Sequence, residues 1–186
     1  MAERENIAII YAGKRFTGKT TTCLQMAAKT GKRIFILNEG SHPSYDHWEH
    51  ISNDQIKHYK GDKVVITVED NINEICAALL SYQANAFIVF EDCQKYIPQT
   101  ISRGGLRSMI IDMRKRNFDL AFMYHTLTFV PPYIASMYNM LVLFKTTDSF
   151  DSSIKKFPNY QTIKKKGLAI NKHKNIHHCE VIMDYE

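Results

Sequence analysis

The chain has 186 residues, 45% of them apolar, which is enough to enclose one sizeable core. The formal charge is a modest +5, and no apolar stretch reaches transmembrane length, so direct insertion into a membrane is excluded. The four cysteines are scattered without a C-x-x-C pair, which favours reduced thiols in a cytosolic setting. The polar start, residues 1–6, predicts no signal peptide.

The first predicted elements are a buried strand over 7–12 and a helix over 20–29, joined by a glycine-rich loop. The loop matches G-x-x-x-x-G-K-[ST], a spacing that folds backbone amides around phosphate at a helix N-terminus. Lys19 is expected to reach the β- and γ-phosphates, and Thr20 to offer its hydroxyl to Mg²⁺. The sequence therefore predicts a nucleoside triphosphate site, formed by Gly13, Lys14, Arg15, Phe16, Thr17, Gly18, Lys19, Thr20 and Thr21.

Strand-like and helical patterns alternate along the rest of the chain. Apolar runs predict strands at 33–37, 56–59, 64–68, 86–90, 120–124 and 141–144. Apolar residues at helical spacing, or prolines that begin a helix, predict helices at 72–82, 106–116 and 131–138. Residues 41–53 are expected to be irregular, and the tail is expected to form an edge hairpin from 168–170 and 180–183. The alternation predicts an α/β fold with a mostly parallel sheet flanked by helices and a C-terminal β-hairpin.

Two acids, Glu91 and Asp92, follow the most strand-like run of the middle region. In a P-loop ATPase, acids are needed where a central strand ends, and we expect this strand to neighbour the strand before the glycine-rich loop. One acid then completes the Mg²⁺ shell, and the other positions and deprotonates the attacking water. His125 follows the next strand, where a polar side chain could sense the γ-phosphate; a structural role for this histidine is the alternative.

Basic residues are clustered in two segments. A helical projection of 103–116 places Arg103, Arg107 and Arg114 on one face, where they could act as an arginine finger, contact DNA phosphates or simply face solvent. Arg103 is the first candidate for the finger. Residues 155–174 hold seven lysines and no acid, which indicates either a polyanion-binding surface or a solvated face. The adjacent histidines and Cys179 near the C-terminus do not have the spacing of a zinc site.

The order of these motifs resembles the FtsK–HerA superfamily of P-loop ATPases. The resemblance rests on the glycine-rich loop, on Glu91-Asp92-Cys93-Gln94, and on 114–126 followed by Pro131-Pro132. With so short a chain and a histidine at the sensor position, it looks most like the genome-packaging ATPases of internal-membrane icosahedral viruses. The resemblance covers about residues 7–147, and we expect one domain over 1–186 with a basic C-terminal extension over 148–186.

The resemblance implies a RecA/FtsK-like fold and an ATPase that translocates double-stranded DNA, with ATP and Mg²⁺ as ligands. Carried over by position, Lys19 and Thr20 bind nucleotide and Mg²⁺, Glu91 and Asp92 form the acid pair, and His125 is the sensor. The family's usual acid order is Asp-Glu, so the order here is inverted. The family also implies a ring of five or six subunits, contacts with a capsid vertex or portal-like protein, and a location in the cytoplasm of the infected cell or in the virion. Lys145 is a second candidate for a group acting in trans.

Two other functions remain open from the sequence. A nucleoside or nucleotide kinase is one, because Phe16-Thr17-Gly18-Lys19-Thr20 is similar to the loop of thymidine kinases. That family usually carries a cysteine-rich zinc module, which this chain lacks. A nucleotide-gated assembly or scaffold protein with vestigial hydrolysis is the other, and the inverted acid pair is the feature that favours it.

Overall fold

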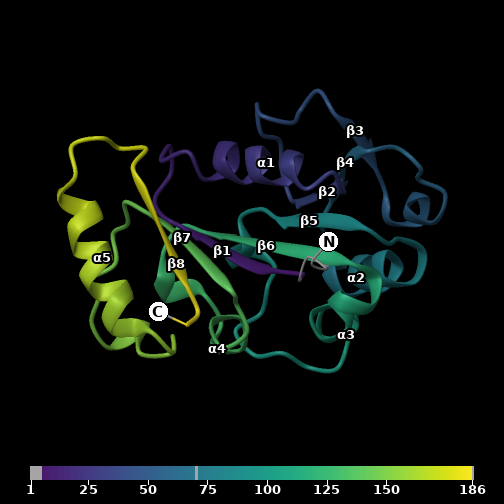
Figure 1. The fold of residues 1–186 in the computed structure, drawn as a ribbon. Coiled ribbons are helices and arrows are strands. Elements are labelled where there is room, and N and C mark those ends of the chain that lie inside the picture. The colour runs from purple at the N-terminus through teal and green to yellow at the C-terminus, as the bar shows by residue number, and fades with distance from the viewer. Residues whose placement is uncertain (1–5, 70, 186) are drawn as a thin grey trace, which may run out of the picture.

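The computed structural model describes residues 6–69 and 71–185 and is drawn in Figure 1. The expectation based on the polar start therefore lies outside the described residues, except at Asn6. Within the two described ranges, no helix combines the length and the apolar character that crossing a bilayer requires.

A sheet occupies the centre of the molecule, and the described residues give it eight strands in the order β3-β4-β2-β5-β6-β1-β7-β8. Neighbours run parallel except for β7 and β8, which are antiparallel. The central strands are apolar and buried on both faces, as in parallel sheets covered by helices. The strands are β1 (Ala8–Ala12), β2 (Arg33–Asn38), β3 (Glu49–Ile51), β4 (Lys63–Thr67), β5 (Ala86–Phe90), β6 (Phe118–Tyr124), β7 (Met140–Phe144) and β8 (Cys179–Met183).

Helices cover both faces of this sheet (Figure 1). They are α1 (Lys19–Lys29), α2 (Ile72–Tyr82), α3 (Gly105–Asp112), α4 (Pro132–Ala135) and α5 (Tyr160–Lys172). Short 3₁₀ turns lie at Asn53–Lys57, Cys93–Lys95, Met113–Arg116, Leu127–Phe129 and Ser152–Ile154. Cys23 and Ala27 of α1 join the apolar cluster on one face, and the other four helices contribute to the cluster on the opposite face. Ile163 and Ile170 of α5 belong to this second cluster, so the basic C-terminal segment packs onto the main core.

The structure confirms the predicted α/β fold with a mostly parallel sheet, flanking helices and a C-terminal antiparallel strand pair. Two predicted strands are wrong. The strand at 56–59 is absent because its first residues belong to the 3₁₀ turn Asn53–Lys57, which begins at a capping box between Ser52 and Gln55. Residues 168–170 lie inside α5, so β8 pairs with β7 instead. The segment 41–53, expected to be irregular, contains β3.

The predicted adjacency of the acid-bearing strand and the P-loop strand is also wrong, because β6 lies between β5 and β1. Leu120 of β6 is in register with Ala8 of β1 on one side and with Ile88 of β5 on the other. Because the carboxyl ends of parallel strands meet at one edge, His125 after β6 falls between the glycine-rich loop and the acid pair.

The predicted arginine row on α3 is corrected by the limits of the helix. Arg103 lies before α3 and Arg114 lies in the 3₁₀ turn after it, so one helical projection does not relate the arginines. All three, including Arg107, are exposed. The apolar face of the helix is buried as predicted, with Leu106 and Met109 in the core against α2.

Candidate active site

The glycine-rich loop connects β1 to α1 and is anchored to the strands on both sides of β1. The Gly13 amide donates to the Tyr124 carbonyl at 3.1 Å, and the Lys14 amide donates to the Lys145 carbonyl at 2.8 Å. A Cβ on Gly13 would lie only 2.6 Å from the Cβ of Phe144. Only glycine therefore fits where the loop leaves β1, and the loop backbone is fixed against the ends of β6 and β7.

Lys19 points back into this loop from the first turn of α1. Its Nζ donates to the carbonyls of Gly13 at 2.6 Å and Lys14 at 3.1 Å, and the residue is only 7% exposed. Burial lowers the pKa of Lys19, while the nearby carboxylates of Glu91 and Asp92 act in the opposite direction. The cation is thus held at the loop by two carbonyl oxygens, and phosphate oxygens are acceptors that could replace them.

Thr20 faces the first acid. Its Oγ1 donates to the Glu91 carboxylate, with both carboxylate oxygens at 3.3 Å. Glu91 is 6% exposed, and burial together with repulsion from Asp92 raises its pKa from 4.5 to about 7. A hydroxyl and a carboxylate are oxygen ligands of the kind that Mg²⁺ takes, and a cation beside them would offset the cost of ionising a buried acid. The two side chains therefore fit a Mg²⁺ site.

Asp92 has the opposite environment. Its Oδ1 lies 3.1 Å from His125 Nε2, and its Oδ2 lies 3.3 Å from Lys95 Nζ. The nearby His125 is the largest cause that lowers the pKa of Asp92, from 3.8 to about 2. The residues around the two neighbouring acids thus push their pKa values apart, with Asp92 ionised and Glu91 able to hold a proton near neutral pH.

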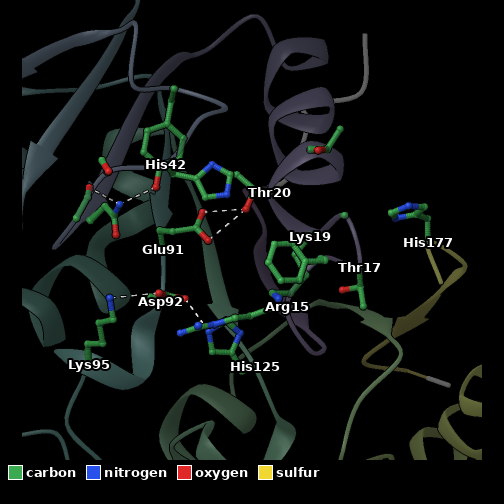
Figure 2. A pocket seen from close by; sticks show the side chains of 17 residues that line it. Arg15, Thr17, Lys19, Thr20, His42, Glu91, Asp92, Lys95, His125 and His177 are labelled. Atoms are coloured by element: carbon green, nitrogen blue, oxygen red, sulfur yellow. Dashed lines mark hydrogen bonds and ion pairs between the residues drawn. The ribbon is translucent and has the colours of Figure 1, made fainter.

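These side chains border a single cavity of about 480 Å³, which lies at the carboxyl edge of the sheet (Figure 2). Of the residues predicted for the site, Gly13 and Lys14 are not among those that line the cavity, and their carbonyls accept from Lys19 Nζ. Arg103 is not among the residues that line it. The predicted residues that do line it are Arg15, Phe16, Thr17, Gly18, Lys19, Thr20, Thr21, Glu91, Asp92 and His125.

The cavity also has residues that sequence reasoning did not place there. Asn38 ends β2 and donates to the Tyr45 hydroxyl at 2.7 Å, and His42 stacks on the Tyr45 ring with centroids 5.1 Å apart. Asn38 could have been predicted as a site residue, because it is a polar residue directly after an apolar strand run. His42 and Tyr45 belong to the segment 41–53, which was expected to be irregular and was given no role from the sequence. The remaining lining residues are Gly40, Ser41, Lys95 and His177.

The C-terminal histidines lie in the loop between α5 and β8. The rings of His173 and His178 stack with centroids 4.0 Å apart, and His178 Nε2 lies 3.3 Å from a Glu180 carboxylate oxygen. His177, from the same loop, lines the cavity (Figure 2). Across the part of the chain that the structure describes, no group of three or more histidine, cysteine or acidic side chains is arranged to hold a metal ion.

Comparison with solved structures finds this fold in several proteins. The genome packaging NTPase B204 from Sulfolobus turreted icosahedral virus 2, in complex with AMP, superposes with a TM-score of 0.75 at 11% identity, covering 98% of this chain and 95% of that one. The DNA-packaging ATPase B204 from Sulfolobus turreted icosahedral virus gives a TM-score of 0.66 at 10% identity, covering 94% and 96%. The N-terminal domain of zonular occludens toxin from Neisseria meningitidis gives 0.50 at 10% identity, covering 77% and 79%.

A scan of protein families and a search of curated protein sequences found no match to this chain. The structural likeness is therefore a likeness of fold, and it extends over nearly the whole length of both the chain and the B204 proteins. The chain has the fold of viral genome-packaging NTPases, with its own lysine, acid pair and histidine gathered at one cavity.

Proposed function

We propose that this chain hydrolyses ATP and uses the energy to move double-stranded DNA, packaging a viral genome into a preformed capsid. The observation that carries the proposal is the convergence of Lys19, Thr20, Glu91, Asp92 and His125 on one cavity. The fold supports it, because solved proteins with the same fold over nearly their whole length are described as genome-packaging NTPases and DNA-packaging ATPases. Residues 1–186 act in this proposal as one ATPase domain of the FtsK–HerA type.

In this proposal, the loop amides and Lys19 bind the phosphates of ATP. The Lys19 ammonium exchanges its carbonyl partners in the loop for the oxygens of the β- and γ-phosphates. Thr20 and Glu91 would hold Mg²⁺, which supplies charge neutralisation for the β- and γ-phosphates. Glu91 loses its proton when it takes this role, because a nearby cation favours its charged form.

Asp92 is the proposed general base. It is ionised, it sits beside the cavity, and its side chain is 23% exposed, so that water can reach it. His125 Nε2 lies 3.1 Å from Asp92 Oδ1 and is the group that a γ-phosphate would attract. When the His125 side chain turns from Asp92 to the γ-phosphate, the carboxylate is left able to accept a proton from water. Activation of water then depends on a bound γ-phosphate, which is the role expected of a sensor residue.

A ring of five or six subunits would complete each site with a basic group from its neighbour. Arg103 is our first candidate for this group, since it is exposed and does not line the cavity of its own chain. Lys145 is the second candidate, because it lies directly beyond β7 and its carbonyl holds the Lys14 amide at the rim of the loop. An arginine or lysine supplied in this way neutralises charge that develops on the transferred phosphoryl group.

The basic C-terminal segment is the proposed DNA contact. Lys156 and Lys166 donate to backbone carbonyls of Thr128 and Val181, which gives them structural roles. The other lysines of the segment are exposed, namely Lys155, Lys164, Lys165, Lys172 and Lys174. Contacts to backbone phosphates would make DNA binding independent of sequence and sensitive to salt. We place the assembled ring in the cytoplasm of the infected cell or at the packaging vertex of the virion, against a portal-like protein.

The test is a steady-state ATPase assay of the purified chain with and without double-stranded DNA, run beside an assay for phosphorylation of thymidine. DNA-stimulated release of phosphate that is lost in Asp92→Asn supports the proposed motor. Phosphate transfer to the nucleoside would replace it with a kinase. Tight ATP binding without turnover, with or without DNA, would replace it with a nucleotide-gated assembly protein.

A further inference from the structure

His177 reaches the nucleotide cavity from a part of the chain far from the other lining residues. It lies on the loop between α5 and β8, and Figure 2 shows it across the cavity from Asp92 and Lys95. Its ring lies over the turn where the glycine-rich loop becomes α1, since a Cβ on Gly18 would be 3.5 Å from His177 Nδ1. The side chain is exposed, so it is free to meet a ligand.

The sheet explains how this histidine arrives there. Because β8 is antiparallel to β7, its first residue, Cys179, is in register with Phe144, the last residue of β7. The loop before β8 therefore emerges at the same edge as the glycine-rich loop. The loop is held by its own side chains: the His177 amide donates to Asn175 Oδ1 at 2.9 Å, and the Asn175 amide donates to His173 Nδ1 at 3.2 Å.

The direction of a bound triphosphate follows from the order of the strands. The groups proposed for the γ-phosphate, Asp92 and His125, follow β5 and β6 on one side of β1. The amides at the start of α1 take the β- and then the α-phosphate. The nucleoside consequently leaves the loop on the opposite side of β1, toward β7 and β8, which is the side from which His177 extends.

We propose that His177 packs its imidazole against the base of the bound nucleotide and is the nucleoside-binding side chain of this site. The proposal rests on the proposed function, because it takes the orientation of the triphosphate from that function. A flat ring stacks on any base, since every base has a π-face, so the contact binds ATP and GTP with similar strength. It also assigns part of the nucleotide site to the C-terminal segment, which the sequence had placed outside the ATPase core.

The test distinguishes the nucleoside's contribution to binding from that of the phosphates. It measures affinity by titration calorimetry in the presence of Mg²⁺ for ATPγS, GTPγS and inorganic tripolyphosphate. His177→Ala is expected to weaken binding of both nucleotides about tenfold while leaving the affinity for tripolyphosphate within about twofold of the wild type. His177→Phe, which keeps a flat ring, is expected to retain most of the nucleotide affinity. Ile176→Ala changes the exposed neighbour in the same loop; it is the matched control and is expected to bind all three ligands as the wild type does.

Two results would overturn the proposal. One is unchanged nucleotide affinity in His177→Ala. The other is an equal loss of affinity for tripolyphosphate, which would mean that the side chain contacts the phosphates or stabilises the loop. A wild-type chain that binds none of the three ligands would overturn the proposed function, and this proposal with it. Failure of the proposed function is thus distinguished from failure of the histidine contact alone.

Discussion

Replacing Glu91 with glutamine should stabilise the ligand-free protein at neutral and alkaline pH, even though this residue belongs to the proposed catalytic site. Glu91 is buried beside Asp92, and its pKa rises from 4.5 to about 7, a difference of about 2.5. Each pKa unit corresponds to about 1.4 kcal/mol, so ionising the folded protein costs on the order of 3 kcal/mol. Glutamine has a similar shape and never ionises, so it avoids this cost.

The sign of the effect follows from proton binding. Between pH 4.5 and about 7, the folded state holds a proton on Glu91 that the unfolded state has released, so the free energy of unfolding falls as the pH rises. Below pH 4.5 both states are protonated and the group contributes no pH dependence. Glu91→Gln should therefore gain stability over the wild type progressively between these values and keep a constant advantage above about pH 8.

The assay is urea unfolding, or thermal melting, of both proteins at pH 5 and pH 8 in the presence of EDTA. The free energy of unfolding of Glu91→Gln should exceed that of the wild type, and this excess should be larger at pH 8 than at pH 5 by up to about 3 kcal/mol. The corresponding change in melting temperature is roughly 6–12 °C. The control is Glu74→Gln on the exposed face of α2, which makes the same chemical change in water. Saturating Mg²⁺ and nucleotide should remove most of the difference. A difference between wild type and Glu91→Gln that is the same at both pH values would refute this reasoning.

Three further predictions concern turnover and DNA. Lys19→Ala should lower ATP hydrolysis at least about 100-fold, since it removes the charge at the β- and γ-phosphates; unchanged hydrolysis would dismiss the site. Asp92→Asn should lower kcat about 100-fold or more while ATP binding, measured by calorimetry, stays within about threefold; rapid hydrolysis would assign the base to another residue. Changing Lys164, Lys165 and Lys172 together to alanine should flatten the salt dependence of DNA binding by about 0.9 in log–log slope per lost phosphate contact, and an unchanged slope would make them a solvated face. The matched control changes three exposed lysines elsewhere on the surface, namely Lys29, Lys57 and Lys60.

Local patterns were enough to predict most elements of the fold. The helix at Ile72–Tyr82 and the strand at Ala86–Phe90 have the predicted limits, because apolar spacing in each directly reflects the face that is buried. Helix α5 was not predicted, and residues 168–170 inside it were assigned to a strand because they form a short apolar run. Its buried positions, Ile163, Gly167 and Ile170, are nevertheless spaced by four and then three residues, which is a helical signature.

The arrangement of the strands could not be predicted in the same way. The insertion of β6 between β5 and β1 depends on which buried strands pair, and neighbouring apolar runs carry little local information about their partners. For the site, the glycine-rich loop and the acids after β5 were recognisable because their chemistry is carried by adjacent residues. His177 was not, because the pairing of β7 with β8 alone brings it to the cavity.

The inverted order of Glu91 and Asp92 left open which acid would bind the metal ion and which would activate water. The structure places Glu91 against Thr20, and it places Asp92 against His125 and Lys95. The first position in the pair is thus deeply buried beside Thr20, and the second is partly exposed and held ionised. This arrangement supports metal binding by the first acid and water activation by the second, in spite of the shorter side chain at the second position.

The most direct test of the central claim is a crystal structure of the chain with Mg²⁺ and a non-hydrolysable ATP analogue. We predict the terminal phosphate between Lys19 and the Asp92–His125 pair, with the cation bound to the hydroxyl of Thr20 on the side facing Glu91. An analogue that binds elsewhere, or one whose terminal phosphate points away from Asp92 and His125, would contradict the account.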